Sequence, residues 1–211
     1  MTPLDLRRAA PVLHTPRLRV ALTRPDHAAA FCAGVAASRH RLQHVGWGLK
    51  PRDLAWAQRF CDDDARCIAE GRDLAWHVFA ADDAADRQWL GRIDLHSIDP
   101  ASRRGEVGYV GHAAHAGRGL MREAVRAVIG EGFRLGLARI EALSDTRNAR
   151  ALRFAEALGL RFEGVLHWHE RDPQGLLCDM AVFAALNPAA QDEAAVPLPG
   201  PAGPPAGATP G

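Results

Sequence analysis

A strand, a glycine-rich turn and a helix follow one another between residues 105 and 134, and this segment constrains the fold most. The strand reads GEVGYVG (105–111), the turn reads HAGRG (115–119), and apolar residues then recur with a helical period. Glycines let a turn bend tightly beside a ligand, and the first amides of a helix lack partners within the helix. The segment therefore predicts a nest of backbone amides suited to an anion such as pyrophosphate.

Spacing excludes two other phosphate-binding motifs. The chain has no GxxxxGK[ST] sequence, which excludes a P-loop NTPase. The turn also lacks the third glycine of a GxGxxG dinucleotide-binding site. A Gly-Arg-Gly sequence alone is equally typical of a helix cap or a plain tight turn, so the motif needs support from the rest of the chain.

The rest of the chain alternates between segments typical of strands and of helices. Helices are expected to begin near Pro25 and at Pro51, and strands and helices alternate after residue 73. This order predicts an α/β fold with a mixed sheet of about seven strands covered by helices. The expected strands span 17–22, 74–81, 89–97, 105–111, 139–144, 160–170 and 176–186, and the later helices span 120–133 and 148–158.

Composition divides the chain into one domain, residues 1–187, and a tail, residues 188–211. The tail holds seven prolines, four glycines and no aromatic residue, a composition typical of disorder. A net charge of +1 gives no indication of a nucleic-acid partner, and no apolar run is long enough to cross a membrane. The absence of a signal-peptide pattern and of CxxC pairs favours a cytoplasmic protein.

Four motifs in the correct order resemble the GNAT acetyltransferases. The sequence GEVGYVGHAAHAGRGLMREAV (105–125) resembles the acetyl-CoA-binding signature of that family, and the resemblance continues through TRNARALRFAEALGL (146–160), EGVLHW (163–168) and CDMAVFAAL (178–186). The opening LHTPRLRVALTRPDHAAAF (13–31) is similar to the ribosomal-protein N-acetyltransferase branch, the RimJ/RimL-like enzymes. Each motif is weak alone, but their order is specific.

The resemblance implies a twisted mixed sheet with helices on both faces and two central parallel strands that splay apart, with acetyl-CoA in the cleft. It implies that backbone amides of the turn bind the diphosphate and that three further residues contact the pantetheine arm. Two departures stand out, because Ala116 replaces the usual Gln or Arg, and Met121 replaces the usual small residue. The implied diphosphate residues are Gly117, Arg118, Gly119, Leu120 and Met121, and those of the arm are Tyr109, Val110 and Asn148.

Acetyl transfer to an amine requires an unprotonated nitrogen, which a carboxylate can generate as general base. The resemblance places Glu170 where the ribosomal branch has a proposed catalytic glutamate, and it places Glu106 where many other members keep a base. We prefer Glu170 from the sequence. The residues that would protonate the leaving thiolate are replaced by Ala151 and Ala155. A thiol of pKa about 8.5 is a tolerable leaving group without a dedicated acid.

Four further residues are candidates for contact with the acceptor. His44 and Trp47 lie in the loop between the first two helices, and His167 and His169 lie on the strand that carries Glu170. His167, His169 and Glu170 lie close together in the sequence and could together bind a metal ion. No fourth ligand stands in a recognisable pattern with them, so we expect no metal.

The sequence therefore predicts an acetyl-CoA-dependent N-acetyltransferase that acts on a primary amine, either a protein N-terminus or a small molecule, and that could form a homodimer. Two alternatives remain open. Ala116, Ala151 and Ala155 are compatible with a non-catalytic module that binds acyl-CoA. A small-molecule acetyltransferase, acting on an antibiotic such as an aminoglycoside or on a polyamine, would need an acidic pocket, and no motif distinguishes it.

Overall fold

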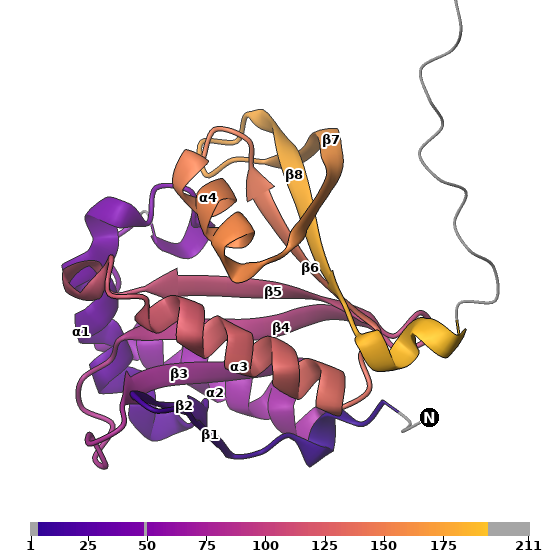
Figure 1. Ribbon diagram of the computed structural model, residues 1–211. Helices are drawn as coiled ribbons and strands as arrows, with labels where there is room; N and C mark the ends of the chain where they lie inside the picture. The colour runs from indigo at the N-terminus through magenta and orange to yellow at the C-terminus, as the bar shows by residue number, and fades with distance from the viewer. Residues whose placement is uncertain (1–3, 49, 194–211) are drawn as a thin grey trace, which may run out of the picture.

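The computed structural model describes residues 4–48 and 50–193, which form one mixed sheet with helices on both faces (Figure 1). The sheet has eight strands in the order β1-β2-β3-β4-β5-β6-β8-β7. The strands are β1 (Val12–His14), β2 (Leu18–Leu22), β3 (Leu74–Ala80), β4 (Gly91–Asp99), β5 (Arg104–Gly111), β6 (Arg139–Asp145), β7 (Arg161–Arg171) and β8 (Leu177–Leu186).

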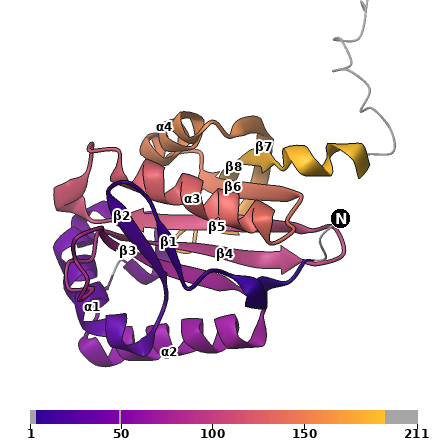
Figure 2. The same ribbon diagram turned by 60° about the horizontal axis from the view of Figure 1, so that its bottom comes forward.

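Four α-helices cover the sheet in two layers. They are α1 (Ala28–Ser38), α2 (Leu54–Glu70), α3 (Leu120–Arg134) and α4 (Ala149–Leu158). Short 3-10 helices are η1 (Leu6–Arg8), η2 (Pro25–His27), η3 (Arg39–Arg41), η4 (Gly46–Gly48), η5 (Ala113–His115) and η6 (Pro188–Glu193). Figure 2 shows α1 and α2 below the sheet and α3 above it. The predicted α/β class and two-sided cover are confirmed.

Each face of the sheet has its own apolar core. The larger core packs α3 and α4 against residues such as Ile93 and Leu95 of β4, which are completely buried. The smaller core packs α1 and α2 around Phe31 and Phe79. Alternate residues of a strand point to opposite faces, so β4 serves both layers. Its residues 93 and 95 enter the larger core, and its residues 92, 94 and 96 face the layer of α2.

Two helix starts show how local capping fixes the boundaries. The predicted start of α2 at Pro51 is wrong, because the helix begins at Leu54 after Asp53, whose carboxylate accepts the Trp56 amide at 2.7 Å. Helix α4 begins after Asn148, whose side-chain oxygen accepts the Ala151 amide at 3.1 Å. The eighth strand, β1, is three residues long, which is too short for periodicity to reveal.

The sheet divides between its two parallel strands, β5 and β6. Their registered pairs are Arg104–Arg139, Gly105–Ile140 and Glu106–Glu141. Beyond Glu106 the strands separate: β5 continues beside β4 to Gly111, and β6 continues beside β8 to Asp145. Figure 1 shows β6, β8 and β7 turning away from the plane of β2 to β5. The predicted splay is confirmed, and one edge of β5 after Glu106 has no strand partner in the described sheet.

The domain boundary at residue 187 stays a prediction. A 3-10 helix, η6, follows it over Pro188–Glu193. Asn187 attaches this segment to the fold, because its side-chain amide donates to the Leu137 carbonyl at 2.9 Å and its backbone amide donates to the Ala138 carbonyl at 2.9 Å. The remaining part of the predicted tail, residues 194–211, lies outside the described residues.

None of the helices in residues 4–48 and 50–193 has the length and apolar character that a membrane span requires.

Candidate functional site

A cavity of about 810 Å³ lies where β5 and β6 separate. Its walls come from α2, β4, β5, β6, the start of α4, the loop before α2 and the β7–β8 hairpin. Seven of the sequence-predicted residues line it: Glu106, Tyr109, Val110, Asn148, Glu170, His44 and Trp47. Segments far apart in the sequence therefore meet at the place where the sheet divides.

The glycine-rich turn lies beyond the end of β5, outside the cavity lining. Gly117 and Gly119 both adopt left-handed backbone conformations, with φ of 81° and 74°, and Gly119 immediately precedes the first residue of α3. Among the described residues, no side chain caps the N-terminus of α3, so the first backbone N–H groups of the helix remain free to donate to a ligand. Arg17 holds the turn in place by donating to the Arg118 carbonyl at 3.0 Å. This geometry fits a bound diphosphate.

Met121 occupies the position where the resembling sequences have a small residue, and two glycines accommodate it. A Cβ atom added to Gly91 would lie 2.3 Å from the Met121 sulfur, and one added to Gly111 would lie 2.7 Å from Met121 Cγ. The thioether therefore packs on the backbone of β4 and β5. The Met121 side chain therefore has a packing role, while its backbone amide lies in the first turn of α3.

Tyr109 of β5 and Asn148, which immediately precedes α4, both line the cavity. Burial raises the pKa of Tyr109 to about 12, and its ring packs against Phe154 of α4 with ring centroids 4.8 Å apart. Asn148 uses its side-chain oxygen to cap α4, which leaves its NH2 group as the donor for a ligand in the cavity. Both residues suit the contacts with an amide-containing arm that the sequence predicts.

Glu106 lies at the closed end of the opening. It belongs to the last registered pair of β5 and β6, and its side chain is 25% exposed. Its carboxylate lies 3.7 Å from Nε2 of His96, which is opposite it on β4. A half-buried carboxylate at the point where the strands divide faces any group held between them.

Glu170 also lines the cavity, but its surroundings differ. Its side chain is exposed, and no cation among the described residues forms an ion pair with its carboxylate. The contact that the structure gives it is through the backbone, because the Cys178 thiol donates to its carbonyl at 3.5 Å. The structure brings both predicted carboxylates into one cavity and gives Glu106 the more defined position.

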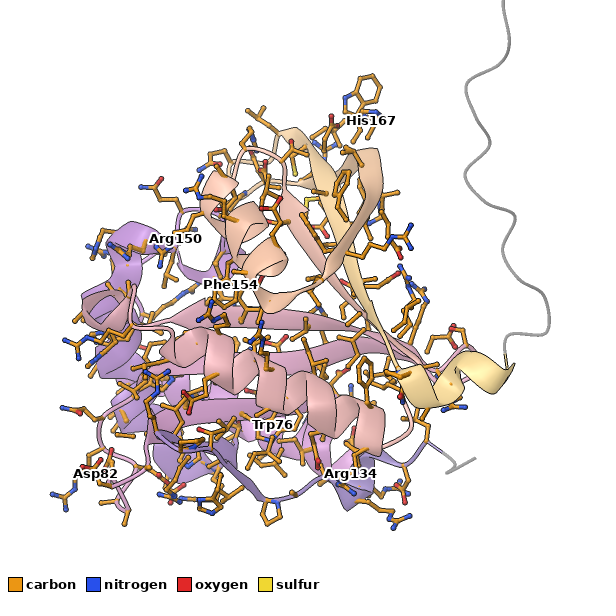
Figure 3. The ribbon with its side chains drawn as sticks, in the orientation of Figure 1. Trp76, Asp82, Arg134, Arg150, Phe154 and His167 are labelled. Atoms are coloured by element: carbon orange, nitrogen blue, oxygen red, sulfur yellow. The ribbon has the colours of Figure 1, made fainter. Side chains whose placement is uncertain are left out.

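The structure does not place His167 or His169 in the cavity. Between its pairings with Met180 and Cys178 of β8, β7 has two extra residues, and Trp168 there adopts φ of 52°. This bulge interrupts the pairing of β7 with β8. His167 turns to Asp179, with Nδ1 2.9 Å from Oδ2. Figure 3 shows His167 at the outer end of the β7–β8 hairpin. The cavity lining does not include His167 or His169, and their contact with the acceptor stays a prediction.

His44 and Trp47 do reach the cavity from the opposite loop. His44 Nδ1 lies 3.8 Å from Asp145 Oδ2 of β6. The Trp47 ring packs among Phe31, Trp56 and Phe60, with ring centroids 5.7 to 5.9 Å apart. Trp47 therefore combines a packing role with a place on the cavity surface.

Sequence reasoning missed a buried ionic network on the β4 wall. Arg92 is buried and forms ion pairs with Asp94 and, at 2.9 Å, with Asp64 of α2. Burial opposes ionisation of Asp94, but the Arg92 guanidinium and then His96 outweigh it and hold the pKa of Asp94 at about 2. The alternation of Arg92, Asp94 and His96 along β4 is the sequence signal, because it marks a polar face on a central strand.

The four cysteines, Cys32, Cys61, Cys67 and Cys178, are free thiols. Within residues 4–48 and 50–193, no group of three or more His, Cys, Asp or Glu side chains is arranged to hold a metal ion.

A sheet that opens between two parallel strands, with an amide-lined helix start beyond one strand and a carboxylate in the opening, defines the acetyltransferase class of α/β folds. The Acetyltransferase (GNAT) domain model matches residues 17–161, which is well over half of the chain. The chain belongs to the GNAT acetyltransferase family.

Two curated relatives come from Bacillus subtilis (strain 168). The chain is 35% identical over 119 residues to the probable N-acetyltransferase YjcK, a match that covers 56% of this chain and 65% of YjcK. It is 30% identical over 125 residues to the uncharacterized N-acetyltransferase YoaA, covering 59% of this chain and 68% of YoaA. The match to YjcK thus falls just short of two thirds of that protein.

Solved structures share the fold. A RimL ribosomal L7/L12 α-N-protein acetyltransferase in complex with coenzyme A superposes with a TM-score of 0.74 at 16% identity, covering 83% of this chain and 97% of the other. A ribosomal-protein-S5-alanine acetyltransferase from Vibrio fischeri gives a TM-score of 0.71 at 20% identity, covering 84% and 97%. At these identities the likeness concerns the fold.

Proposed function

We propose that the chain is an N-acetyltransferase that moves an acetyl group from acetyl-CoA to a primary amine. One observation carries the proposal. The separation of β5 from β6 places Glu106 at the closed end of a cavity, while the unpaired edge of β5 leads from there to the uncapped start of α3. An extended cosubstrate with a diphosphate at one end and a thioester at the other matches this path.

The residues of the path suit the parts of acetyl-CoA. The amides of Gly117 to Met121 would bind the diphosphate, and Arg118, which is exposed, would add a positive charge beside it. The unpaired edge of β5 at Tyr109 and Val110 would pair with the amides of the pantetheine arm, and Asn148 would donate to that arm from the other side. Among the structural neighbours, the RimL structure contains coenzyme A, and a microcin C7 self immunity acetyltransferase contains acetyl-CoA.

Glu106 is the base that the geometry favours. When bound, acetyl-CoA supplies a thioester, and the amine nitrogen forms a bond to its acyl carbon as the carbon–sulfur bond breaks. An ammonium acceptor first loses one proton to Glu106, and the second nitrogen proton that is lost neutralises the departing thiolate. The reaction therefore releases one proton per turnover. The amide of Val110, on the unpaired edge of β5, would donate to the carbonyl oxygen as negative charge develops there.

Two features fit slow or water-assisted protonation of the leaving group. Ala151 lines the cavity without a donor side chain, and Ala155 is buried in the core. A thiol leaving group with a pKa of about 8.5 needs little assistance. The missing acid therefore does not require a non-catalytic role.

The cavity suits an ammonium acceptor. Its lining contains seven carboxylates but only two arginines, Arg92 and Arg171. The carboxylates are Asp64, Asp73, Asp94, Glu106, Asp145, Glu170 and Asp172. The acceptor is a protein N-terminal α-amine, as the names of the RimL neighbours say of those proteins, or a small amine. An α-amine has a pKa near 7.7–8.0, so it gives up its proton more easily than a lysine. The predicted homodimer stays a prediction.

The test is release of free thiol from acetyl-CoA with a panel of peptides with free N-termini and of small mono- and polyamines. We expect turnover with at least one acceptor and near-background release with Glu106→Gln. Binding of acetyl-CoA without turnover across the panel would support the non-catalytic module instead. Exclusive turnover of polyamines or aminoglycosides would support the small-molecule alternative.

A further inference from the structure

We propose that His96, oriented by Asp94, is a positioning residue that keeps Glu106 ready as the base by taking up its proton and passing it to solvent. The inference rests on the proposed function and adds two residues to it. Neither residue was anticipated from the sequence, and neither belongs to the path for the cosubstrate.

The sheet register brings the three side chains together. Asp94 and His96 are two residues apart on β4 and therefore point to the same face, and Glu106 is the registered partner of His96 on β5. His96 Nδ1 lies 2.7 Å from Asp94 Oδ1, and His96 Nε2 lies 3.7 Å from Glu106 Oε2. The imidazole thus has one nitrogen against each carboxylate, and all three residues line the cavity.

The charges around His96 favour uptake of a proton. The contact with Asp94 raises the pKa of His96 against the opposing effect of burial, and the charges of Asp94, Glu106 and Asp73 add to the increase. Asp73, just before β3, lines the same cavity as His96. Behind Asp94, the ion pair with Arg92 keeps Asp94 ionised, and Arg92 is also ion-paired with Asp64 of α2. An ionised Asp94 stabilises the imidazolium form of His96.

The exposure of His96 provides the exit. Its side chain is 43% exposed, compared with 18% for Asp94 and 25% for Glu106. The proton leaves the ammonium for Glu106, moves to Nε2 of neutral His96 and departs from the imidazolium to water or buffer. Each turnover moves one proton along this route, which equals the one proton that the reaction releases. Glu106 and His96 end in their starting forms.

The first test compares two histidine variants by kinetics. We expect His96→Gln to lower kcat by about tenfold or more and to leave the KM for acetyl-CoA unchanged. A loss of about tenfold is a small part of the rate increase that a general base typically provides. His14 on β1 is exposed and lies outside the cavity lining, so His14→Gln is the matched control and should retain wild-type rates. Unchanged kcat in His96→Gln would overturn the proposal.

The pH dependence separates the relay from a merely structural role. Only neutral His96 accepts a proton, so kcat of the wild type should rise with pH through the raised pKa of His96, above the ordinary histidine value of about 6.5. In His96→Gln this limb should disappear, and the remaining profile should follow the acceptor amine. A limb that persists in His96→Gln would count against His96.

The second test needs no turnover. NMR titration of the His96 ring in the free protein should show a lower pKa in Asp94→Asn and in Glu106→Gln than in the wild type, since each variant removes a facing negative charge. A His96 pKa that does not respond to either change would overturn the relay. A wild type that acetylates no amine would instead refute the proposed function and the relay with it, whereas a fully active His96→Gln refutes the relay alone.

Discussion

The two ionic networks at the cavity are built from the same kinds of side chain but differ in the burial of the arginine at their centre. The inner wall, formed by Asp64, Arg92, Asp94, His96 and Glu106, centres on an arginine whose side chain is 9% exposed. The outer wall, formed by Asp145, Glu170 and Asp172, is supported from outside the lining by Arg147, whose side chain is 52% exposed. Each arginine joins two carboxylates.

The difference in burial assigns the two walls different tasks. A buried ion pair is costly to break, because removing one partner leaves an uncompensated charge away from water. In the outer network the side chains of Asp145 and Asp172 are 8% and 4% exposed, but the Arg147 side chain that joins them reaches solvent, which screens these pairs. The inner wall therefore holds the chemistry in a fixed geometry. At the outer wall, Arg147 links Asp172 of the β7–β8 hairpin to Asp145 at the end of β6, and this link is open to solvent.

The largest expected effect is on stability. Arg92→Met leaves Asp64 and Asp94 without their cation and should lower the free energy of unfolding by about 3–5 kcal/mol. Arg147→Met, the matched change beside the outer wall, should lower the free energy of unfolding less, because solvent reaches and screens this arginine. Urea unfolding of the two variants measures both values. Equal costs would show that the walls do not differ in the way their burial implies.

The next effect is on catalysis. Glu106→Gln should lower kcat/KM by about 10²-fold or more, the size expected for loss of a general base, and Glu170→Gln should stay within about tenfold of the wild type. Steady-state kinetics with the best acceptor from the panel decides between them. The reverse order of effects would restore the preference for Glu170 that the sequence suggested.

A smaller effect concerns binding at the turn, outside both walls. Gly119→Val places a β-branched residue at φ of 74°, where an L-residue costs about 1–2 kcal/mol, so the affinity for coenzyme A should fall by about tenfold or more. Gly130→Ala is the control, since an added Cβ meets nothing within 4 Å there and alanine favours a helix. Calorimetric titration with coenzyme A should find the control unchanged.

The smallest effect is the acid sensitivity of the inner wall. The pKa of Asp94 is about 2 in the fold against an ordinary value of 3.8, so its contribution to stability is present above pH 3.8 and is lost as the pH falls through about 2. Wild-type unfolding should therefore depend on pH more steeply in this window than unfolding of Asp94→Asn. Identical slopes in the two proteins would remove Asp94 from the network.

Much of the fold was predictable because it depends on local signals. The turn at Gly117 and Gly119, the helix that follows it and the C-terminal cap at Gly159 are set by backbone preferences that a sequence displays directly. The start of α2 was misplaced although Asp53, a residue type favoured as N-cap, stood beside Pro51. Propensity alone did not decide between the two positions, and the hydrogen bond from Trp56 did.

The site was only partly predictable because it depends on contacts between distant segments. Glu106 and Glu170 were both recognised from their motifs, but nothing local shows that the bulge at Trp168 directs His167 out of the site. Likewise, Asp64 and Arg92 are 28 residues apart and meet only through the packing of α2 on β4. The resemblance gave the positions of the cosubstrate contacts and of Glu106, and the fold alone supplied the other residues of the inner wall.

The most direct test of the central claim is a crystal structure of the protein with acetyl-CoA or coenzyme A. The account predicts the diphosphate within hydrogen-bond distance of the amides of residues 117–121, the pantetheine arm along β5 at Tyr109 and Val110, and the sulfur between β5 and β6 on the side of Glu106. A ligand bound elsewhere, with the turn empty and the opening between β5 and β6 closed, would contradict it.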